Sequence, residues 1–79
     1  MNKDFSIQLA DAVKFHRKQV GLTQHELANY AGVGKTVIFD IEHAKPTVKM
    51  NTILKVLDVL NISLTLTSPM GHSSGGEDA

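Results

Sequence analysis

Apolar residues recur through most of this chain at the three- and four-residue spacing of amphipathic helices. The first such segment, SIQLADAVKFHRKQV, predicts a helix that Ser6 caps at its N-terminus and that Gly21 ends. Its apolar stripe consists of Leu9, Ala12, Val13 and Val20. A second stripe, in VKMNTILKVLDVLN, predicts a later helix that buries Met50, Ile53, Leu54, Leu57 and Leu60.

Two short helices are predicted between these segments. The sequence TQHE is a capping box, in which the side chains of Thr23 and Glu26 each accept from the other residue's exposed backbone N–H. A helix therefore starts at Thr23 and ends near Ala31, with Gly32 at its C-terminus. A third helix follows Gly34 and runs through KTVIFDIEH.

The period of the pattern changes after the last helix. In ISLTLT, residues 62–67, the apolar side chains of Ile62, Leu64 and Leu66 alternate with serine and threonine, which is typical of a strand. A helix that continues through Leu66 is the alternative. Because the chain offers no second strand, and a lone strand leaves its backbone groups unpaired, we expect these three residues to pair with the same strand of a second copy.

Length and composition predict one small domain over residues 1–67 and a disordered tail over residues 68–79. A chain of 79 residues supports a single compact core, and the tail SPMGHSSGGEDA is rich in glycine and serine. The absence of cysteine excludes disulfides and thiolate chemistry. No apolar run approaches the ~20 residues that span a bilayer, and no signal-peptide core is visible, so a soluble, cytoplasmic protein without a membrane partner is expected.

The charges of the chain nearly cancel. Eight basic and eight acidic residues give a formal net charge of zero. Glu77 and Asp78 both lie in the tail, so residues 1–67 hold eight basic and six acidic side chains, a net charge of +2. Nucleic-acid binders usually carry a stronger basic excess, and this weak bias neither establishes nor excludes a DNA partner.

The stretch NYAGVGKT ends like a nucleotide-binding phosphate loop. That pattern requires a glycine five positions before the Gly-Lys-Thr glycine, where this chain has Asn29, and it must follow a strand. The preceding TQHELANYA is helical in pattern instead. The phosphate-loop interpretation is therefore excluded.

With the phosphate loop excluded, this part of the chain is interpreted as a capped short helix, a tight turn and a second short helix. Ala28 is small where two such helices cross, and Gly32 permits the positive φ that the turn requires. The inward residues that hold the two helices together are Leu27, Ala31, Val33, Ile38 and Ile41. The third helix of the chain, KTVIFDIEH, leaves outward a face suited to a major groove, made of Lys35, Thr36, Phe39, Asp40 and His43.

The run RKQVGLTQHELANYAGVGKTVIFDIE resembles the DNA-binding helix-turn-helix of the phage-repressor (XRE) family, and the flanking segments are similar to HipB-type antitoxins. The resemblance implies a mainly α, lambda-repressor-like helix-turn-helix domain of four helices plus one C-terminal β-strand that pairs across a homodimer. It also implies a repressor that binds an inverted-repeat operator in double-stranded DNA, regulates its own promoter and binds a HipA-like kinase toxin.

The resemblance also assigns roles to single residues. Gln24, at the start of the second helix, corresponds to a phosphate ligand, and Lys35 and Thr36 correspond to base-edge and phosphate positions. Lys35 suits guanine O6 and N7. Phe39 and Asp40 match groove-facing positions but depart from the family's usual polar pair: an aromatic ring can contact a thymine methyl group, whereas a carboxylate repels phosphate.

Other family positions lie outside the groove-facing surface. Arg17 and Glu42 match a pair that forms a structural salt bridge between the first and third helices. Lys45, Thr47 and Lys49, in the loop before the fourth helix, are candidates for contacts with flanking phosphates.

Plainer interpretations compete with several of these roles. Lys35 and Gln24 could be ordinary solvated side chains, and Phe39 could pack on its own domain or on a partner protein. The four histidines lack metal-ligand spacing, and Asp40 and Glu42 face different directions on a helix, so no metal, cofactor or enzymatic activity is expected. Two alternatives to the antitoxin remain: a stand-alone or prophage regulator, and a helical protein-interaction module.

Overall fold

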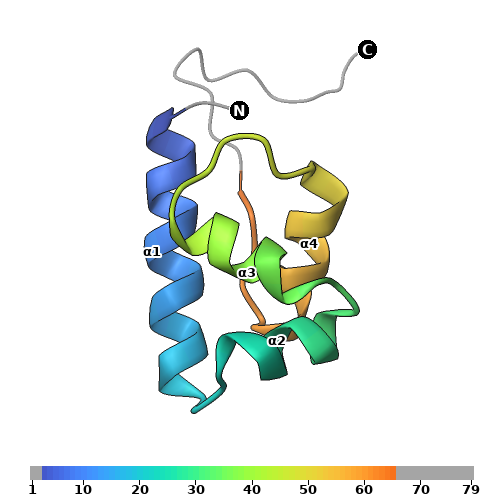
Figure 1. Cartoon of the computed structure of the whole chain (residues 1–79). Helices are drawn as coiled ribbons and strands as arrows, with labels where there is room; N and C mark the ends of the chain where they lie inside the picture. Colours follow the sequence, from blue (N-terminus) through green and yellow to red (C-terminus); the bar gives the residue numbers. More distant parts are fainter. Residues whose placement is uncertain (1–2, 66–79) are drawn as a thin grey trace, which may run out of the picture.

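The computed structural model describes residues 3–65, and helices make up most of this range (Figure 1). The elements in chain order are α1 (Lys3–Gln19), α2 (Gln24–Ala31), α3 (Lys35–Glu42) and α4 (Met50–Val59). The long α1 runs along one side of the molecule, α2 crosses at one end, and α3 lies between α1 and α4 (Figure 1). The predicted tail, and Leu66 and Thr67 of the predicted strand, lie outside the described residues.

Every helix contributes side chains to one apolar core. Its members are Leu9, Val13, Leu27, Ala28, Ile38, Ile41, Ile53, Val56, Leu57 and Leu60. Ala31 and Val33 are partly buried against this cluster. The inward face predicted for the two short helices is therefore confirmed, and the core holds one side of α3 while leaving its other side exposed.

The start of α1 differs from the prediction. The helix begins at Lys3, and Ser6 lies within it with only 2% of its surface exposed, so Ser6 is not the N-cap. Its small side chain is accommodated at a buried helical position. Val20 was placed on the buried stripe, but α1 ends at Gln19 and Val20 is exposed in the following turn.

The buried stripe of α4 is also shifted from the prediction. Ile53, Leu57 and Leu60 are buried as expected, but Met50 and Leu54 are 46% and 47% exposed. Val56, which was not predicted to be buried, is fully buried. The stripe that packs inward therefore follows Ile53, Val56, Leu57 and Leu60, and Met50 and Leu54 face away from the core of this single chain.

The described helices share one type of C-terminal turn. In α2, the N–H of Val33 donates to the carbonyl of Ala28 at 3.0 Å, and that of Gly32 donates to Asn29 at 3.3 Å. This is a Schellman motif with Gly32 in the left-handed region, at φ 71°. The same pair of bonds ends α1, α3 and α4, with the left-handed residues Gly21, Ala44 and Asn61 at φ 75°, 57° and 59°.

The last of these turns directs the end of the described chain. The N–H of Ile62 donates to the carbonyl of Leu57 at 2.9 Å, and Ile62 packs against the core. Residues 62–65 then run back between α1 and α4 (Figure 1) and carry no regular secondary structure within this single chain. The cross-dimer strand stays a prediction, because it requires a second copy.

Candidate nucleic-acid interface

The helix-turn-helix consists of α2, the turn at residues 32–34 and α3. Glu26 N–H donates to Thr23 Oγ1 at 3.0 Å and Thr23 N–H donates to Glu26 Oε1 at 2.9 Å, so the predicted capping box is present. Gly34, at φ −75°, is the N-cap of α3 and provides no side-chain cap. The first N–H groups of α3 are therefore free of a capping side chain from this residue.

Five predicted groove residues share the outward face of α3. Lys35, Thr36, Phe39 and His43 are exposed, and Asp40 is half-buried at the edge of the same face. The opposite face carries Ile38 and Ile41, which are buried in the core. The three loop residues Lys45, Thr47 and Lys49 are also exposed. Lys49 is the N-cap residue of α4.

A polar cluster fixes α3 against α1 and α2. Arg17 Nε lies 2.6 Å from Glu42 Oε2 and Arg17 Nη2 lies 3.0 Å from Glu42 Oε1, which makes a bidentate ion pair. Gln24 Nε2 also donates to Glu42 Oε1, at 3.1 Å. The third donor of Arg17, Nη1, reaches the carbonyl of Leu22 at 2.9 Å. One carboxylate therefore ties the end of α3 to both preceding helices.

The cluster is largely shielded from water. The Arg17 side chain is 11% exposed and that of Glu42 is 2% exposed. Burial alone would raise the pKa of Glu42, but the hydrogen bonds from Arg17 and Gln24, with the positive charge of Arg17, outweigh it and hold that pKa below its usual value of 4.5. The hydrogen bond to Glu42 raises the pKa of Arg17. Both groups are thus held in their charged forms.

The contact between Gln24 and Glu42 was not predicted from the sequence. Gln24 was assigned to a DNA phosphate, and its partner lies 18 positions away, so no local spacing signals the contact. A primary amide has two N–H donors. One is directed at Glu42, which orients the side chain, and the other remains to serve a second acceptor.

Phe39 and His43 form a stacked pair on the exposed face of α3. Their ring centroids are 3.8 Å apart and the ring planes are inclined by 23°. His43 Nδ1 also lies 2.7 Å from the carbonyl oxygen of Phe39. The two residues are four positions apart, so they meet on successive turns of the helix.

Asp40 is paired with a base from the following loop. Its Oδ2 lies 3.8 Å from Lys45 Nζ. The Schellman turn at Ala44 brings Lys45 back over Asp40, since the N–H of Lys45 donates to the Asp40 carbonyl at 2.9 Å. The lysine partly offsets the negative charge that Asp40 places on this face.

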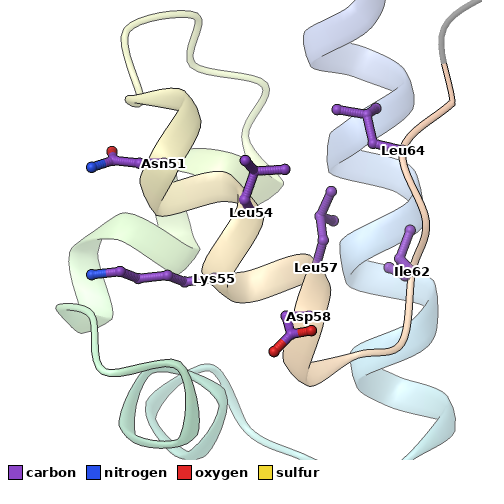
Figure 2. A pocket seen from close by; sticks show the side chains of 7 residues that line it. All are labelled: Asn51, Leu54, Lys55, Leu57, Asp58, Ile62 and Leu64. Atoms are coloured by element: carbon purple, nitrogen blue, oxygen red, sulfur yellow. The ribbon is translucent and has the colours of Figure 1, made fainter.

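The predicted dimerisation residues lie on the other side of the molecule. Leu54 and Leu57 of α4, with Ile62 and Leu64, border an open hollow of about 500 Å³ between α4 and the C-terminal segment (Figure 2). Ile62 is half-buried, whereas Leu64 is exposed. Leu66 lies outside the described residues.

Residues 3–65 hold neither a cluster of metal-ligand side chains nor a membrane-spanning helix. No group of three or more histidine, cysteine, aspartate or glutamate side chains in this range is placed to hold a metal ion. Within the same residues, no helix has the length and apolar character needed to cross a bilayer.

Comparison with known proteins places this geometry in a family. The Helix-turn-helix family profile matches residues 13–66. The uncharacterized HTH-type transcriptional regulator y4mF of Sinorhizobium fredii is 42% identical over 57 residues, which are 72% of this chain and 75% of that protein. Antitoxin HipB of Escherichia coli K12 is 39% identical over 59 residues, 75% of this chain and 67% of HipB.

A solved structure extends the likeness to three dimensions. A chain in a HipA–HipB–O2–O3 complex is 36% identical and superposes with a TM-score of 0.72 over 81% of this chain and 90% of that chain. The profile match covers more than half of the sequence, and the helix-turn-helix lies inside it. The chain therefore belongs to the XRE-type helix-turn-helix family of DNA-binding regulators, and within that family it is related to the HipB antitoxins.

Proposed function

We propose that this protein is a homodimeric, sequence-specific transcriptional repressor in which each copy places α3 in a major groove. The observation that carries this proposal is the two-sidedness of α3. Its inner side is fixed by Ile38, Ile41 and the ion pair of Glu42 with Arg17, and its outer side presents solvent-exposed polar and apolar groups. A helix that is held rigid on one side and exposed on the other can enter a major groove without rearranging on binding.

The exposed groups match the chemistry of a duplex. Lys35 donates to guanine O6 and N7 or to phosphate, and Thr36 binds a base edge or phosphate. Lys45 and Lys49 approach the flanking backbone together with Thr47, where positive charge releases counterions. The second N–H of Gln24 donates to a phosphate at the start of α2, while Glu42 holds its amide in place.

The homodimer is proposed to form through the C-terminal segment. Leu64, Met50 and Leu54 leave apolar surface exposed in the single chain, and Leu64 faces α4 across the hollow in Figure 2. Pairing of residues 62–67 with their counterparts in a second copy would satisfy their backbone groups and cover this surface. Two-fold symmetry then requires an inverted-repeat operator.

We further propose that the protein serves as the antitoxin of a toxin–antitoxin operon. Support comes from the 39% identity to antitoxin HipB and from the structural match to a HipB chain solved in complex with HipA. In this role it binds a HipA-like kinase toxin, represses its own promoter and acts in the cytoplasm, where its DNA is.

A second candidate is a regulator without a toxin partner. The relative with 42% identity, y4mF, is an uncharacterized HTH-type transcriptional regulator whose name mentions no toxin. The DNA chemistry is the same in both cases. A kinase-like reading frame beside this gene, whose product copurifies with the protein, supports the antitoxin role, and its absence supports the stand-alone regulator.

DNA binding is tested by salt titration on a duplex from the region upstream of the gene. Specific binding should weaken steeply with salt, with a log–log slope near −0.9 per phosphate neutralised. Lys35→Ala should weaken binding about tenfold or more, in line with the ~1–3 kcal/mol of a good base contact in each half-site.

Lys18→Ala is the matched control, because it removes the same charge from an exposed position in the last turn of α1, outside both the outer face of α3 and the hollow beside α4. It should change the affinity by less than about threefold, as a distant charge is screened. Equal losses for both variants would show that Lys35 acts only through net charge. No salt-dependent binding by the wild-type protein would contradict the proposed function itself.

A further inference from the structure

Phe39 is an unusual residue for the exposed face of α3. It is 48% exposed, and it is absent from both the core and the apolar side chains packed against it. Covering its ring with a ligand would remove apolar surface from water, which is favourable. The other outward residues of the helix, Lys35, Thr36 and Asp40, are polar.

The ring of Phe39 is held in place before any ligand binds. His43 stacks on it with centroids 3.8 Å apart, and the Nδ1 contact to the Phe39 carbonyl at 2.7 Å restrains the imidazole in turn. One ring face is therefore covered by the imidazole, while the residue as a whole stays 48% exposed. The stack restricts the rotamers of Phe39 and so reduces the entropy lost on binding.

The chemistry of base-pair edges limits what such an apolar surface can recognise. In the major groove, guanine, adenine and cytosine present hydrogen-bonding groups, and only thymine adds an apolar group, the 5-methyl. A methyl group at the same carbon of cytosine presents the same shape. Asp40, which follows Phe39 in the sequence, is paired with Lys45 at 3.8 Å, so its carboxylate does not dominate this part of the face.

We propose that Phe39, supported by His43, is a specificity determinant that reads the 5-methyl group of one pyrimidine in each operator half-site. The ligand class is a 5-methylpyrimidine, thymine or 5-methylcytosine. His43 is a positioning residue that acts through the Phe39 ring. This inference rests on the proposed function, because it requires α3 in a major groove.

The test replaces each thymine of the bound duplex in turn by deoxyuridine, which removes the methyl group and keeps the base pair. Burial of one methyl group corresponds to about a fourfold change in affinity per half-site. Wild-type protein should therefore bind about fourfold more weakly when one symmetric thymine is replaced, and about 15-fold more weakly when both are replaced. Phe39→Ala should bind the thymine and uracil duplexes equally.

Matched variants distinguish a loss of methyl recognition from a general loss of DNA affinity. Lys35→Ala should lose affinity for both duplexes but keep the thymine-to-uracil ratio. His43→Ala should lower that ratio, and His43→Phe, which keeps a ring four positions after Phe39, should restore it. Far-UV circular dichroism checks that Phe39→Ala is folded, as expected for a side chain outside the core.

The outcomes distinguish this inference from the proposed function. If the wild-type protein binds the duplex specifically but no thymine-to-uracil change alters its affinity, methyl reading is overturned and groove binding stands. If Phe39→Ala retains the ratio, another side chain reads the methyl group, and the assignment is wrong. Absence of specific binding by the wild type would overturn the proposed function as well.

A second set of duplexes distinguishes thymine from 5-methylcytosine at the position where loss of the thymine methyl group weakens binding. The thymine–adenine pair is replaced there by cytosine–guanine and by 5-methylcytosine–guanine. A gain of about fourfold on methylation shows that the ring accepts both pyrimidines, so binding responds to cytosine methylation. No gain restricts the ligand to thymine.

Discussion

Replacement of Arg17 by methionine removes the ion pair that joins α1 to α3 while keeping an apolar stem of similar length. Glu42 then loses two of its three hydrogen bonds described above, from Arg17 Nε and Nη2, and keeps the one from Gln24. Its side chain is only 2% exposed, so water cannot replace the lost donors without opening the structure. The variant carries a buried carboxylate with one weak partner.

The expected loss is large for a domain of this size. Removal of one partner from a buried pair costs ~3–5 kcal/mol, and we take the lower end because Arg17 itself is 11% exposed. Typical stabilities of ~0.05–0.15 kcal/mol per residue give roughly 3–9 kcal/mol for residues 3–65. Arg17→Met therefore removes a third or more of the free energy of unfolding.

The double variant Arg17→Met/Glu42→Leu provides the control. An apolar pair of similar volume needs no hydrogen bonds, so its stability should lie within about 1–2 kcal/mol of the wild type and well above that of Arg17→Met alone. With Glu42→Leu as the second single variant, the double-mutant cycle should give a coupling energy of about 2 kcal/mol or more, which separates the charge interaction from lost packing.

The pH dependence supplies a second signature. In the wild type the pKa of Glu42 is lowered, so its stabilisation is fully present above the usual value of 4.5 and is lost as pH falls through the lowered value. In Arg17→Met, burial dominates and raises the pKa of Glu42. The variant's deficit should therefore be largest near pH 7 and shrink toward pH 4.

Urea unfolding followed by circular dichroism measures both effects, at one protein concentration because dimerisation contributes to stability. A loss of about 3 kcal/mol shifts the midpoint by about 2 M or more for a domain with a small m-value. A deficit below about 1 kcal/mol, or one that is equal at pH 4 and pH 7, would refute the view that this ion pair fixes α3.

The remaining predictions concern the turns and the dimer. Gly32→Ala should lower the free energy of unfolding by about 1 kcal/mol, because alanine is strained at the φ of 71° there. No atom lies within 4 Å of the added Cβ, so no steric clash adds to this loss. Thermal melting measures the change, with Gly34→Ser, at φ −75°, as the control without this strain. Ala44→Gly should raise it by about 0.5 kcal/mol, since relief at φ 57° exceeds the entropy cost of glycine, and a loss would contradict this. Leu64→Pro should give monomers with weakened operator binding, and sedimentation showing an intact dimer would exclude strand pairing.

The helix-turn-helix could be predicted from the sequence because its signals are local. The capping box of Thr23 and Glu26 and the left-handed turn at Gly32 each depend on residues within one helical turn. These two features fix where α2 begins and ends. They therefore also fix the direction in which the chain leaves α2 and enters α3. Ile38 and Ile41 are buried as expected from the helical period.

The predictions that failed depend on tertiary packing. Ser6 is a good N-cap residue in isolation, but the apolar face of α1 extends to Phe5, which packs against the core, and the helix continues back to Lys3. In α4, apolar residues occur on several sides, so spacing alone could not separate the stripe of Val56 from that of Met50 and Leu54. The exposed residues belong to the surface that we assign to a second copy.

In the candidate site, too, contacts between residues close in sequence could be predicted, whereas contacts between distant residues could not. The Phe39–His43 stack joins residues four apart on one helix, and a spacing rule could have found it. The contacts of Glu42 with Arg17 and Gln24 span 25 and 18 positions, and only the resemblance pointed to the first of them. The Asp40–Lys45 pair depends on the turn at Ala44, where alanine gives no sequence signal for a left-handed conformation.

Dimethyl sulfate protection of the upstream duplex tests whether two copies of α3 occupy successive major grooves, since this reagent methylates guanine N7 in the major groove. We expect protected guanines in two inverted half-sites centred ~34 Å apart or a multiple of it, with protection lost in Lys35→Ala. Specific binding that leaves every guanine N7 reactive, or that protects a single site without symmetry, would contradict this arrangement of the dimer on DNA.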